Sequence, residues 1–288
     1  MQCPSCGSLP LEKVLDLSNS QTSFWHCPAC GAYPVFPVPK HPASLYTKEY
    51  FEGALHSKSP QYAGYLSYDR HRDVMRKDFA KQFKPWIPAS AGMTKKVLDI
   101  GCATGTALEA MRDLGVPEEK LYGIDVSAYA IDAARRHIPR AELRVEDATR
   151  TDLCGQYDFI ALLDILEHVE NPAALMAKAV AALAPEGKIM VSTPDPESFA
   201  RLVAGARWSE FHAGEHICFV SASWFSWIAK LHKLRIISLN RHGKHVTLEH
   251  ALTRLRAYIP FFPLAKIRCV LHLNMFDRLC IVLEKLPK

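Results

Sequence analysis

Short apolar runs alternate with amphipathic stretches through the middle of the chain, from residue 96 to residue 193. Apolar runs bounded by turn residues are typical of buried strands, whereas apolar residues that recur every three or four positions are typical of helices. Their regular alternation predicts a mostly parallel sheet with helices on both faces. In chain order, the expected elements are KVLDI, helix 106–114, LYGID, helix 128–137, AELRV, YDFIALLD, helix 172–184 and GKIMVST.

The segments that precede this region predict a linker and one more helix. The stretch AYPVFPVPKHP at 32–42 contains four prolines, which exclude a helix and favour an extended linker lying on the next domain. From about Ser67 to Pro85, apolar residues recur near helical spacing between charged residues, which predicts a helix. We therefore expect two domains, residues 1–40 and 41–288.

Composition and charge restrict the class of protein. A chain of 288 residues that is 49% hydrophobic can bury one large core and carry a small appendage. No apolar run is long enough to span a membrane, and the N-terminus lacks the pattern of a signal peptide, so we expect a cytoplasmic protein without a transmembrane segment. The formal charge of +5 is concentrated in residues 251–288, a modest basic tail that is more typical of a solvated surface than of a polyanion site.

Two pairs of cysteines near the N-terminus share one pattern, Cys3-Pro-Ser-Cys6-Gly and Cys27-Pro-Ala-Cys30-Gly. In each CxxC turn two thiolates converge on one ion, and two such turns complete a tetrahedral site of four sulfurs. Disulfide or redox chemistry, the alternative, does not require this duplicated form. Between the pairs, KVLDL and TSFWH alternate apolar and polar residues, as short strands do. Because four thiolates leave no open coordination position, we expect a structural Zn²⁺ in a small ribbon.

The candidate binding residues of the larger domain follow its first two expected strands. Gly101 and Gly105 come after the first strand, and Asp125 ends the second. In an open parallel sheet, ligands bind beyond the carboxyl ends of the strands, where glycine lets the backbone approach a ligand and an acid can accept ribose hydroxyls. The G-x-x-x-G spacing, with Ala103 in its middle, differs from the G-x-G-x-x-G of pyrophosphate loops, which argues against a dinucleotide-dependent dehydrogenase.

Five segments in succession carry a resemblance to a known family. VLDIGCATG, LYGIDVS, VEDATRTDL, YDFIALLDILEHVENP and LAPEGKIMVSTP, over residues 97–194, resemble the motifs of class I S-adenosylmethionine-dependent methyltransferases. The resemblance implies a doubly wound, Rossmann-like α/β sheet of seven strands whose seventh strand is antiparallel. RIISL and DRLCIVLEK are the expected closing pair. The order of ribbon, YTKEYF and methyltransferase core further resembles bacterial enzymes that methylate sugars, glycans and small natural products.

The resemblance also implies the cofactor contacts. It implies that the glycine loop contacts the methionine end of the cofactor and that the end of the second strand contacts the ribose. The loop after the third strand would contact the adenine, and the end of the fourth strand would lie near the sulfonium. In that order the residues are Asp99, Gly101, Cys102 (through its backbone) and Gly105; Asp125 and Val126; Asp147 and Ala148; Asp164 and Ile165. The family most often has glycine where this chain has Ala103, and because a methyl group is the smallest addition, we expect binding to be retained.

Methyl transfer from a sulfonium needs an in-line nucleophile and little water, and a base helps when the acceptor must lose a proton. His168 follows the fourth core strand, and His212 and His216 follow the fifth. We select His168 and His216 as candidate catalytic residues, with a structural role as the alternative for each. Tyr46, with its aromatic neighbours in YTKEYF, either covers the cofactor or docks a helix on the core.

Three functions remain open from the sequence. The first is transfer of a methyl group to a small-molecule or glycan acceptor, with S-adenosylhomocysteine as the second product. The second is RNA methylation with the ribbon contacting RNA, although residues 1–40 contain only Lys13 and Lys40 as basic residues, which argues against a nucleic-acid partner. The third is a noncatalytic, cofactor-binding protein that docks through the ribbon or the segment 256–276. The acceptor, the methylated atom and the oligomeric state are not determined.

Overall fold

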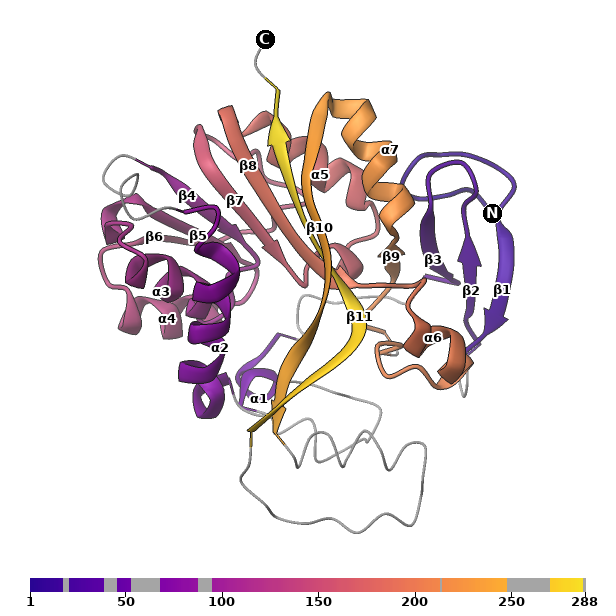
Figure 1. Ribbon diagram of the computed structural model, residues 1–288, viewed down its shortest axis with the longest axis horizontal. Coiled ribbons are helices and arrows are strands. Elements are labelled where there is room, and N and C mark those ends of the chain that lie inside the picture. The colour runs from indigo at the N-terminus through magenta and orange to yellow at the C-terminus, as the bar shows by residue number, and fades with distance from the viewer. Residues whose placement is uncertain are drawn as a thin grey trace.

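The computed structural model describes residues 1–17, 21–38, 46–52, 68–87, 95–212, 214–247 and 270–286. In these residues the chain forms a seven-stranded sheet of order β10-β11-β8-β7-β4-β5-β6 and a four-stranded sheet of order β1-β2-β3-β9 (Figure 1). The large sheet comprises β4 (Val97–Ile100), β5 (Leu121–Asp125), β6 (Glu142–Val145), β7 (Tyr157–Leu163), β8 (Leu183–Pro194), β10 (Leu234–Thr247) and β11 (Val270–Lys285).

Strand directions in the large sheet confirm the predicted topology. β4 pairs in parallel with β5 and β7, and the parallel arrangement continues to β6 on one side and β8 on the other. β11 is antiparallel to both β8 and β10. The two expected closing segments therefore form the antiparallel edge of a class I methyltransferase sheet, although both strands extend well beyond RIISL and DRLCIVLEK.

Helices cover both faces of this sheet because successive side chains of its strands point to opposite sides. Leu98 and Ile100 of β4 belong to the core shared with α5 and α7, whereas Val97 belongs to the core shared with α2, α3 and α4. The helices are α1 (Lys48–Phe51), α2 (Tyr68–Phe83), α3 (Thr106–Asp113), α4 (Ala128–His137), α5 (Pro172–Ala181), α6 (Phe199–Ala204) and α7 (Ala222–His232), with short 3₁₀ turns η3 (Glu118–Lys120), η4 (Leu166–His168) and η5 (Gly205–Arg207).

One predicted helix boundary was wrong. The helix expected over 172–184 ends at Ala181, and β8 begins at Leu183. Leu183 already pairs with Tyr157 of β7. Residues whose apolar character fits either a helix or a strand are therefore part of the sheet here. Helix α2 agrees with its prediction and ends before Pro85.

The N-terminal cysteine region forms its own antiparallel ladder of β1 (Glu12–Asp16), β2 (Ser23–His26) and β3 (Ala32–Phe36). β3, within the segment expected to be a linker, pairs with β9 (Cys218–Val220) of the larger region, with Ala32 opposite Val220. Figure 1 shows this small sheet beside β9 and α7. The extended conformation was predicted correctly, but the segment is a hydrogen-bonded strand that ties the ribbon to the chain just after His216.

Two buried side-chain hydrogen bonds strengthen this connection. Ser221 caps α7 and donates its hydroxyl proton to the carbonyl oxygen of Gly31 at 2.8 Å. The indole Nε1 of Trp224 donates to Ser5 Oγ, also at 2.8 Å. The first turn of α7 is therefore anchored on both cysteine turns of the ribbon.

Two further expectations concern the suggested docking surface and the absence of a transmembrane segment. The segment 256–269, most of the suggested docking surface, lies outside the described residues. None of the helices in the described part of the chain is long and apolar enough to cross a membrane.

Candidate active site and four-cysteine cluster

The four predicted metal ligands converge on one point. One sulfur from each of Cys3, Cys6, Cys27 and Cys30 lies within 4.8 Å of the others. Cys3 Sγ is 3.8 Å from Cys30 Sγ, and Cys6 Sγ is 3.6 Å from Cys27 Sγ. A tetrahedral zinc with Zn–S bonds of about 2.3 Å separates its sulfurs by about 3.8 Å, so the donor set and its spacing fit this ion.

Each cysteine pair is closed by a glycine that the geometry requires. Gly7 and Gly31 both have φ of +79°, and their amides donate to the carbonyl oxygens of Cys3 and Cys27 at 2.8 Å. A Cβ on Gly31 would lie 2.2 Å from Ser223 Oγ and 2.8 Å from the backbone nitrogen of Trp224. The glycine thus serves the turn and also the close approach of α7.

The thiols of the cluster interact strongly before any metal is considered. The hydrogen bond between Cys3 and Cys30 lowers the pKa of Cys3 to about 5. The same hydrogen bond, together with burial, raises the pKa of Cys30 far above its ordinary value. The sulfurs are closely packed, and binding of a metal would release the thiol protons.

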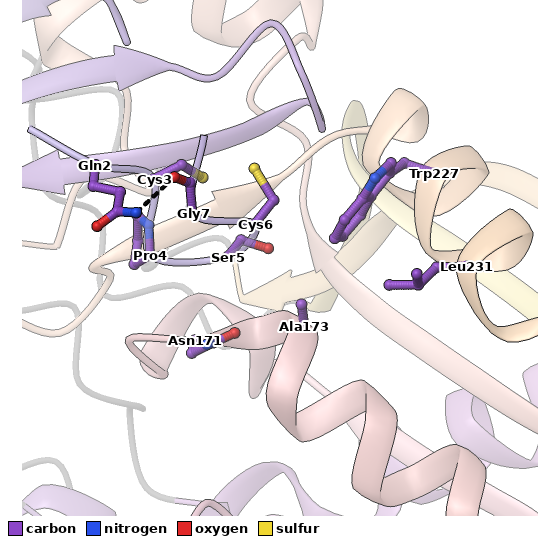
Figure 2. Close-up of a pocket in the computed structure, with 10 residues that line it drawn as sticks. All are labelled: Gln2, Cys3, Pro4, Ser5, Cys6, Gly7, Asn171, Ala173, Trp227 and Leu231. Atoms are coloured by element: carbon purple, nitrogen blue, oxygen red, sulfur yellow. Dashed lines mark hydrogen bonds between the residues drawn. The ribbon is translucent and has the colours of Figure 1, made fainter. Parts of the chain in front are cut away.

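A pocket of about 610 Å³ lies beside the first cysteine turn (Figure 2). Residues 2–7 form one side, Asn171, the N-cap of α5, and Ala173 form the floor, and Trp227 and Leu231 of α7 form the other side. Because Gln2 Nε2 donates to the carbonyl oxygen of Gly7 at 2.7 Å, the first cysteine turn is closed at this wall.

The glycine loop after β4 crosses the end of β5. The amides of Gly101 and Cys102 both donate to the carbonyl oxygen of Ile124, at 2.8 and 3.0 Å. Gly101 has φ of +76°, and a Cβ there would lie 2.9 Å from Ile165 Cδ1, so the side chain of Ile165 covers this glycine. The structure thus brings the predicted methionine-end and sulfonium-end residues together.

Gly105 has a second reason to be glycine that the motif does not reveal. Its φ is +83°, and a Cβ would lie 3.0 Å from the Cβ of Ala134, so this position lets α3 and α4 pack closely. The loop is also held from outside, because Arg72 of α2 donates to the carbonyl oxygen and hydroxyl of Thr104 at 3.0 and 2.9 Å and pairs with Glu109.

Asp125 organises the loop and keeps acceptor capacity for a ligand. Its Oδ2 accepts from the amide of Ala103 at 2.9 Å, and its Oδ1 accepts from the amide of Ser127 at 2.8 Å. Burial raises the pKa of Asp125, although these amides oppose the shift by stabilising the carboxylate. Each carboxylate oxygen has a further lone pair, so both hydroxyls of a ribose can donate to this side chain.

Asp99 is 2% exposed, and its Oδ1 is buried without a hydrogen-bond partner among the described residues. Burial, followed by the charge of Asp125, raises the pKa of Asp99 to about 7. An unsatisfied buried carboxylate oxygen at the edge of the sheet fits the ammonium group of an amino-acid ligand, which would supply both a hydrogen bond and a compensating charge.

The remaining predicted cofactor residues lie around the same edge. Cys102 points away from it, since a Cβ on Gly123 would meet Cys102 Sγ at 2.8 Å; only the backbone of Cys102 faces the loop. Asp147 accepts from the amide and hydroxyl of Thr149, at 2.9 and 2.6 Å, and so shapes the turn that carries Ala148. Val126 continues the chain from Asp125 to the cap of α4.

Asp164 adopts φ of +57° at the end of β7, and its carboxylate is already engaged. Oδ1 accepts from Ser192 Oγ at 2.9 Å and forms an ion pair with the buried Arg278 of β11. Arg278 also lies 3.6 Å from Glu210. The carboxylate of Asp164 therefore joins the end of β7 to β8 and β11. A ligand that contacts this carboxylate would share it with Arg278.

Both predicted catalytic histidines lie together, beside a carboxylate that the sequence did not single out. The rings of His168 and His216 have centroids 4.7 Å apart at an angle of 82°. Together with Glu167, which is fully buried, they place one ligand atom each within 4.8 Å of one another. The amide of Ile217 donates to the carbonyl oxygen of Glu167 at 2.8 Å, which joins η4 to the segment that carries His216.

Tyr46 links this cluster to the ribose side of the site. Its hydroxyl lies 3.3 Å from His168 Nδ1, and its carbonyl oxygen accepts from Ser127 Oγ at 2.6 Å. Tyr50 and Phe51 are buried against α4. The docking alternative is therefore observed, with α1 packed on α4, while Tyr46 reaches across to His168.

Several residues of the site could not have been found from the sequence. Glu215 reaches His168, and Arg278 reaches Glu210, only through tertiary contacts between distant segments, whereas Glu210 contacts His216 six residues further along the chain. Glu167 alone had a signal, as the neighbour of His168 in the DILEHV motif.

A methyltransferase-domain family model matches residues 68–239, more than half of the chain. The chain belongs to the S-adenosylmethionine-dependent methyltransferases. The matched residues include the glycine loop, Asp125 and the histidine cluster.

Named relatives cover part of the chain. A ubiquinone biosynthesis O-methyltransferase of Bordetella avium (strain 197N) is 32% identical over 133 residues, which are 43% of this chain and 54% of the relative. A protein of the same name from Pseudomonas aeruginosa (strain LESB58) is 31% identical over 150 residues, 46% of this chain and 63% of the relative. The chain thus spans less than two thirds of the length of these curated relatives.

Solved structures support the fold over a longer stretch. Magnesium protoporphyrin IX methyltransferase from Synechocystis PCC 6803 has a TM-score of 0.55 at 13% identity and covers 85% of this chain and 100% of its own. The plantazolicin methyltransferase BpumL, solved with S-adenosylhomocysteine, has a TM-score of 0.53 at 18% identity and covers 83% and 93%. At these identities the likeness shows the shared architecture.

Proposed function

We propose that this methyltransferase transfers a methyl group from S-adenosylmethionine to a hydroxyl group of a small-molecule acceptor. The observation that carries the proposal is the cluster of Glu167, His168 and His216 at the carboxyl end of β7, directly after the Ile165 that covers the glycine loop. The O-methyltransferase names of the relatives support an oxygen acceptor. A glycan hydroxyl belongs to the same chemical class.

Cofactor binding follows from the arrangement of the loop. Asp99 would pair with the ammonium group of the methionine end, Asp125 would accept the ribose hydroxyls, and the turn of Asp147 and Ala148 would receive the adenine. Gly101, Cys102, Gly105 and Val126 would contribute backbone, and Ile165 would lie close to the sulfonium. S-adenosylmethionine supplies an activated methyl group when bound, so this chain's task is to align the acceptor, exclude water and accept a proton.

The acceptor proton is removed at the histidine cluster. The Nδ1 atom of His216 lies 2.6 Å from the carbonyl oxygen of Glu210. A carbonyl can only accept, so Nδ1 carries the proton and Nε2 keeps the lone pair that a base needs. The Nδ1 atom of His168 contacts the carbonyl oxygen of Glu215 at 3.1 Å in the same way. Both imidazoles are thereby held in the tautomer that can take a proton through Nε2.

The four-cysteine cluster would hold a structural Zn²⁺, and residues 1–40 would form a ribbon domain beside the methyltransferase domain 41–288. The sulfur spacing supports the ion, and the saturated donor set supports a structural role. Through β3 and β9, the ribbon would hold the segment that presents His216 to the acceptor.

The test is methyl transfer from labelled S-adenosylmethionine to a panel of phenols, catechols, sugars and transfer RNA. We expect a small hydroxyl compound to be methylated, with turnover lowered at least about tenfold by His216→Gln while the affinity for S-adenosylhomocysteine is unchanged. His232→Gln, at the last residue of α7, is the matched control. Undiminished turnover in His216→Gln would remove this residue as base, and methylation of transfer RNA alone would favour the RNA alternative.

A further inference from the structure

We propose that Glu167, His168 and His216 form a divalent-metal site, distinct from the four-cysteine cluster, at the carboxyl end of β7. One donor atom from each residue lies within 4.8 Å of the others. Two imidazoles and one carboxylate suit borderline ions such as Zn²⁺, Co²⁺, Mn²⁺ or Fe²⁺, and they leave coordination positions for water or an acceptor oxygen. This open donor set contrasts with the saturated set of four sulfurs in the ribbon.

The spacing of the donors is close to that of a formed site. Ligand atoms about 2.1 Å from a metal lie about 3 to 3.5 Å apart when they are neighbours in the coordination sphere. The donors of Glu167, His168 and His216 already lie within 4.8 Å of one another, and binding a metal would draw them inward to this spacing. The backbone is held in place by the hydrogen bond from the amide of Ile217 to the carbonyl oxygen of Glu167.

Each ligand also has a hydrogen-bond partner that orients it. Nδ1 of His168 and Nδ1 of His216 point to the carbonyl oxygens of Glu215 and Glu210, at 3.1 and 2.6 Å. Thr193 of β8 donates its hydroxyl proton to Glu167 Oε2 at 3.1 Å. Metal-binding histidines in proteins typically donate their other ring nitrogen to a carbonyl or carboxylate, which sets the tautomer and leaves the ligating nitrogen unprotonated.

The charges around the cluster favour a cation. Arg278 pairs with Asp164 and lies 3.6 Å from Glu210. His212 Nδ1 lies 3.8 Å from Glu215 Oε2, and the His212 ring stacks on that of His216 at 4.4 Å. With Glu167, this network in the described chain contains four acidic side chains around one guanidinium. A divalent ion at the cluster would lie among these acidic side chains, whose charge favours a cation.

The use of such an ion rests on the proposed function, whereas its binding does not. In the metal-bound protein, this ion would replace His216 in its role as base: an acceptor hydroxyl bound to the cation would have a lowered pKa and would lose its proton to water. The acceptor oxygen would then form a bond to the methyl carbon, the carbon–sulfur bond would break, and its electron pair would remain on the sulfur of S-adenosylhomocysteine. The histidines would thus act as ligands in the metal-bound protein.

The experiment is a Co²⁺ titration of the full chain after the ribbon has been loaded with zinc and weakly held metal has been removed. We expect one additional cobalt per chain, with visible d–d bands and without the near-ultraviolet charge-transfer band that thiolate ligands produce. Glu167→Gln and His216→Gln should each weaken cobalt binding at least about tenfold, since even the loss of a residue that only orients a ligand costs that much. The matched control His232→Gln should bind cobalt as the wild type does.

Failure of the site and failure of the proposed function give different results. Absence of saturable cobalt binding, or unchanged binding in Glu167→Gln and His216→Gln, would overturn the metal site even if the metal-free protein methylates its acceptor. Wild-type affinity of each variant for S-adenosylhomocysteine shows that it is folded; if His216→Gln fails this check, the isosteric Glu167→Gln decides. Absence of S-adenosylhomocysteine binding by the wild type would overturn the proposed function and leave the cobalt count valid.

Discussion

The four-cysteine cluster and the predicted cofactor edge, formed by the glycine loop after β4 and Asp125 at the end of β5, are organised in opposite ways. The ribbon strands are short, and the two cysteine turns beside them bring four sulfurs together. Within this cluster, one pair of sulfurs is 3.6 Å apart and another is 3.8 Å apart, an arrangement that a metal would complete. The cofactor edge is already held by protein contacts, including two amides on Asp125 and the side chain of Ile165 over Gly101. A bound ion would add its binding free energy to the folding of a small module, whereas a doubly wound sheet provides a binding edge by itself.

The two regions nevertheless share one strand pair. β3 of the ribbon pairs with β9, and β9 follows His216 directly. Damage at the cysteines should therefore reach the acceptor side of the active site while sparing the glycine loop. Substitutions in each region test whether the two regions are independent and how far along the chain each effect extends.

The largest effect is expected from Cys27→Ser. Loss of one sulfur ligand should abolish tight zinc binding, which in small zinc modules is worth on the order of 10 kcal/mol of folding free energy. Hydrogen exchange should then show lost protection in β3, β9 and residues 214–217, with β4 and β5 unchanged. The exposed Cys154→Ser is the control. Full protection of β9 in Cys27→Ser would show that the two regions are uncoupled.

A smaller effect is expected from Asp99→Asn, measured as free energy of unfolding against pH. Burial raises the pKa of Asp99 to about 7, so its protonated form stabilises the ligand-free protein below the unfolded-state pKa. This stabilisation is lost as the pH rises through about 7, by up to about 4 kcal/mol.

The difference between wild type and Asp99→Asn isolates this residue, because burial also raises the pKa of Glu215 to about 7 and both proteins share that contribution. The wild type should lose stability between pH 4 and pH 7 more steeply than the variant. Parallel curves for the two proteins would contradict the assignment. Asp132→Asn, an exposed acid on α4, should follow the wild type.

Asp125→Ala should weaken S-adenosylhomocysteine binding by at least about 100-fold in calorimetry. Each hydrogen bond to a charged group is worth about 1.5 to 3 kcal/mol, and the ribose would lose two. Because Asp125 also holds the amides of Ala103 and Ser127, Asp125→Asn, which keeps one acceptor oxygen, should fall between the two proteins. Wild-type affinity in both variants would show that the ribose does not bind at the end of β5.

The smallest effect is expected from Ala103→Gly. Ala103 has φ of +46°, which costs a non-glycine residue about 1 kcal/mol, and glycine adds a similar amount of unfolded-state entropy. Stability should change by less than about 1 kcal/mol. Gly101→Ala is the contrasting variant, because its Cβ would lie 2.9 Å from Ile165 Cδ1 and should destabilise the loop. Equal changes in stability for the two substitutions would show that a methyl group is tolerated equally at positions 101 and 103.

The alternation of apolar runs and amphipathic stretches predicted the large sheet well, because a strand buried between two helical layers needs a continuous apolar run. The glycine pattern and Asp125 predicted the binding edge for an equally local reason: their function depends on backbone turns and strand ends. Prediction was poorer where two patterns overlap. Residues 182–184 satisfy a helix and a strand alike, and pairing of Leu183 with Tyr157 decides for the strand.

The sequence by itself determined the fold class, the four-cysteine pattern and the residues at the end of each parallel strand, since each of these arises from short-range spacing. Tertiary structure alone decided that β3 pairs with β9, that Tyr46 reaches His168, and that His216 joins Glu167. These contacts link segments far apart in the chain, and their formation depends on how the whole sheet closes rather than on any local preference. The acceptor side of the active site belongs to this second group.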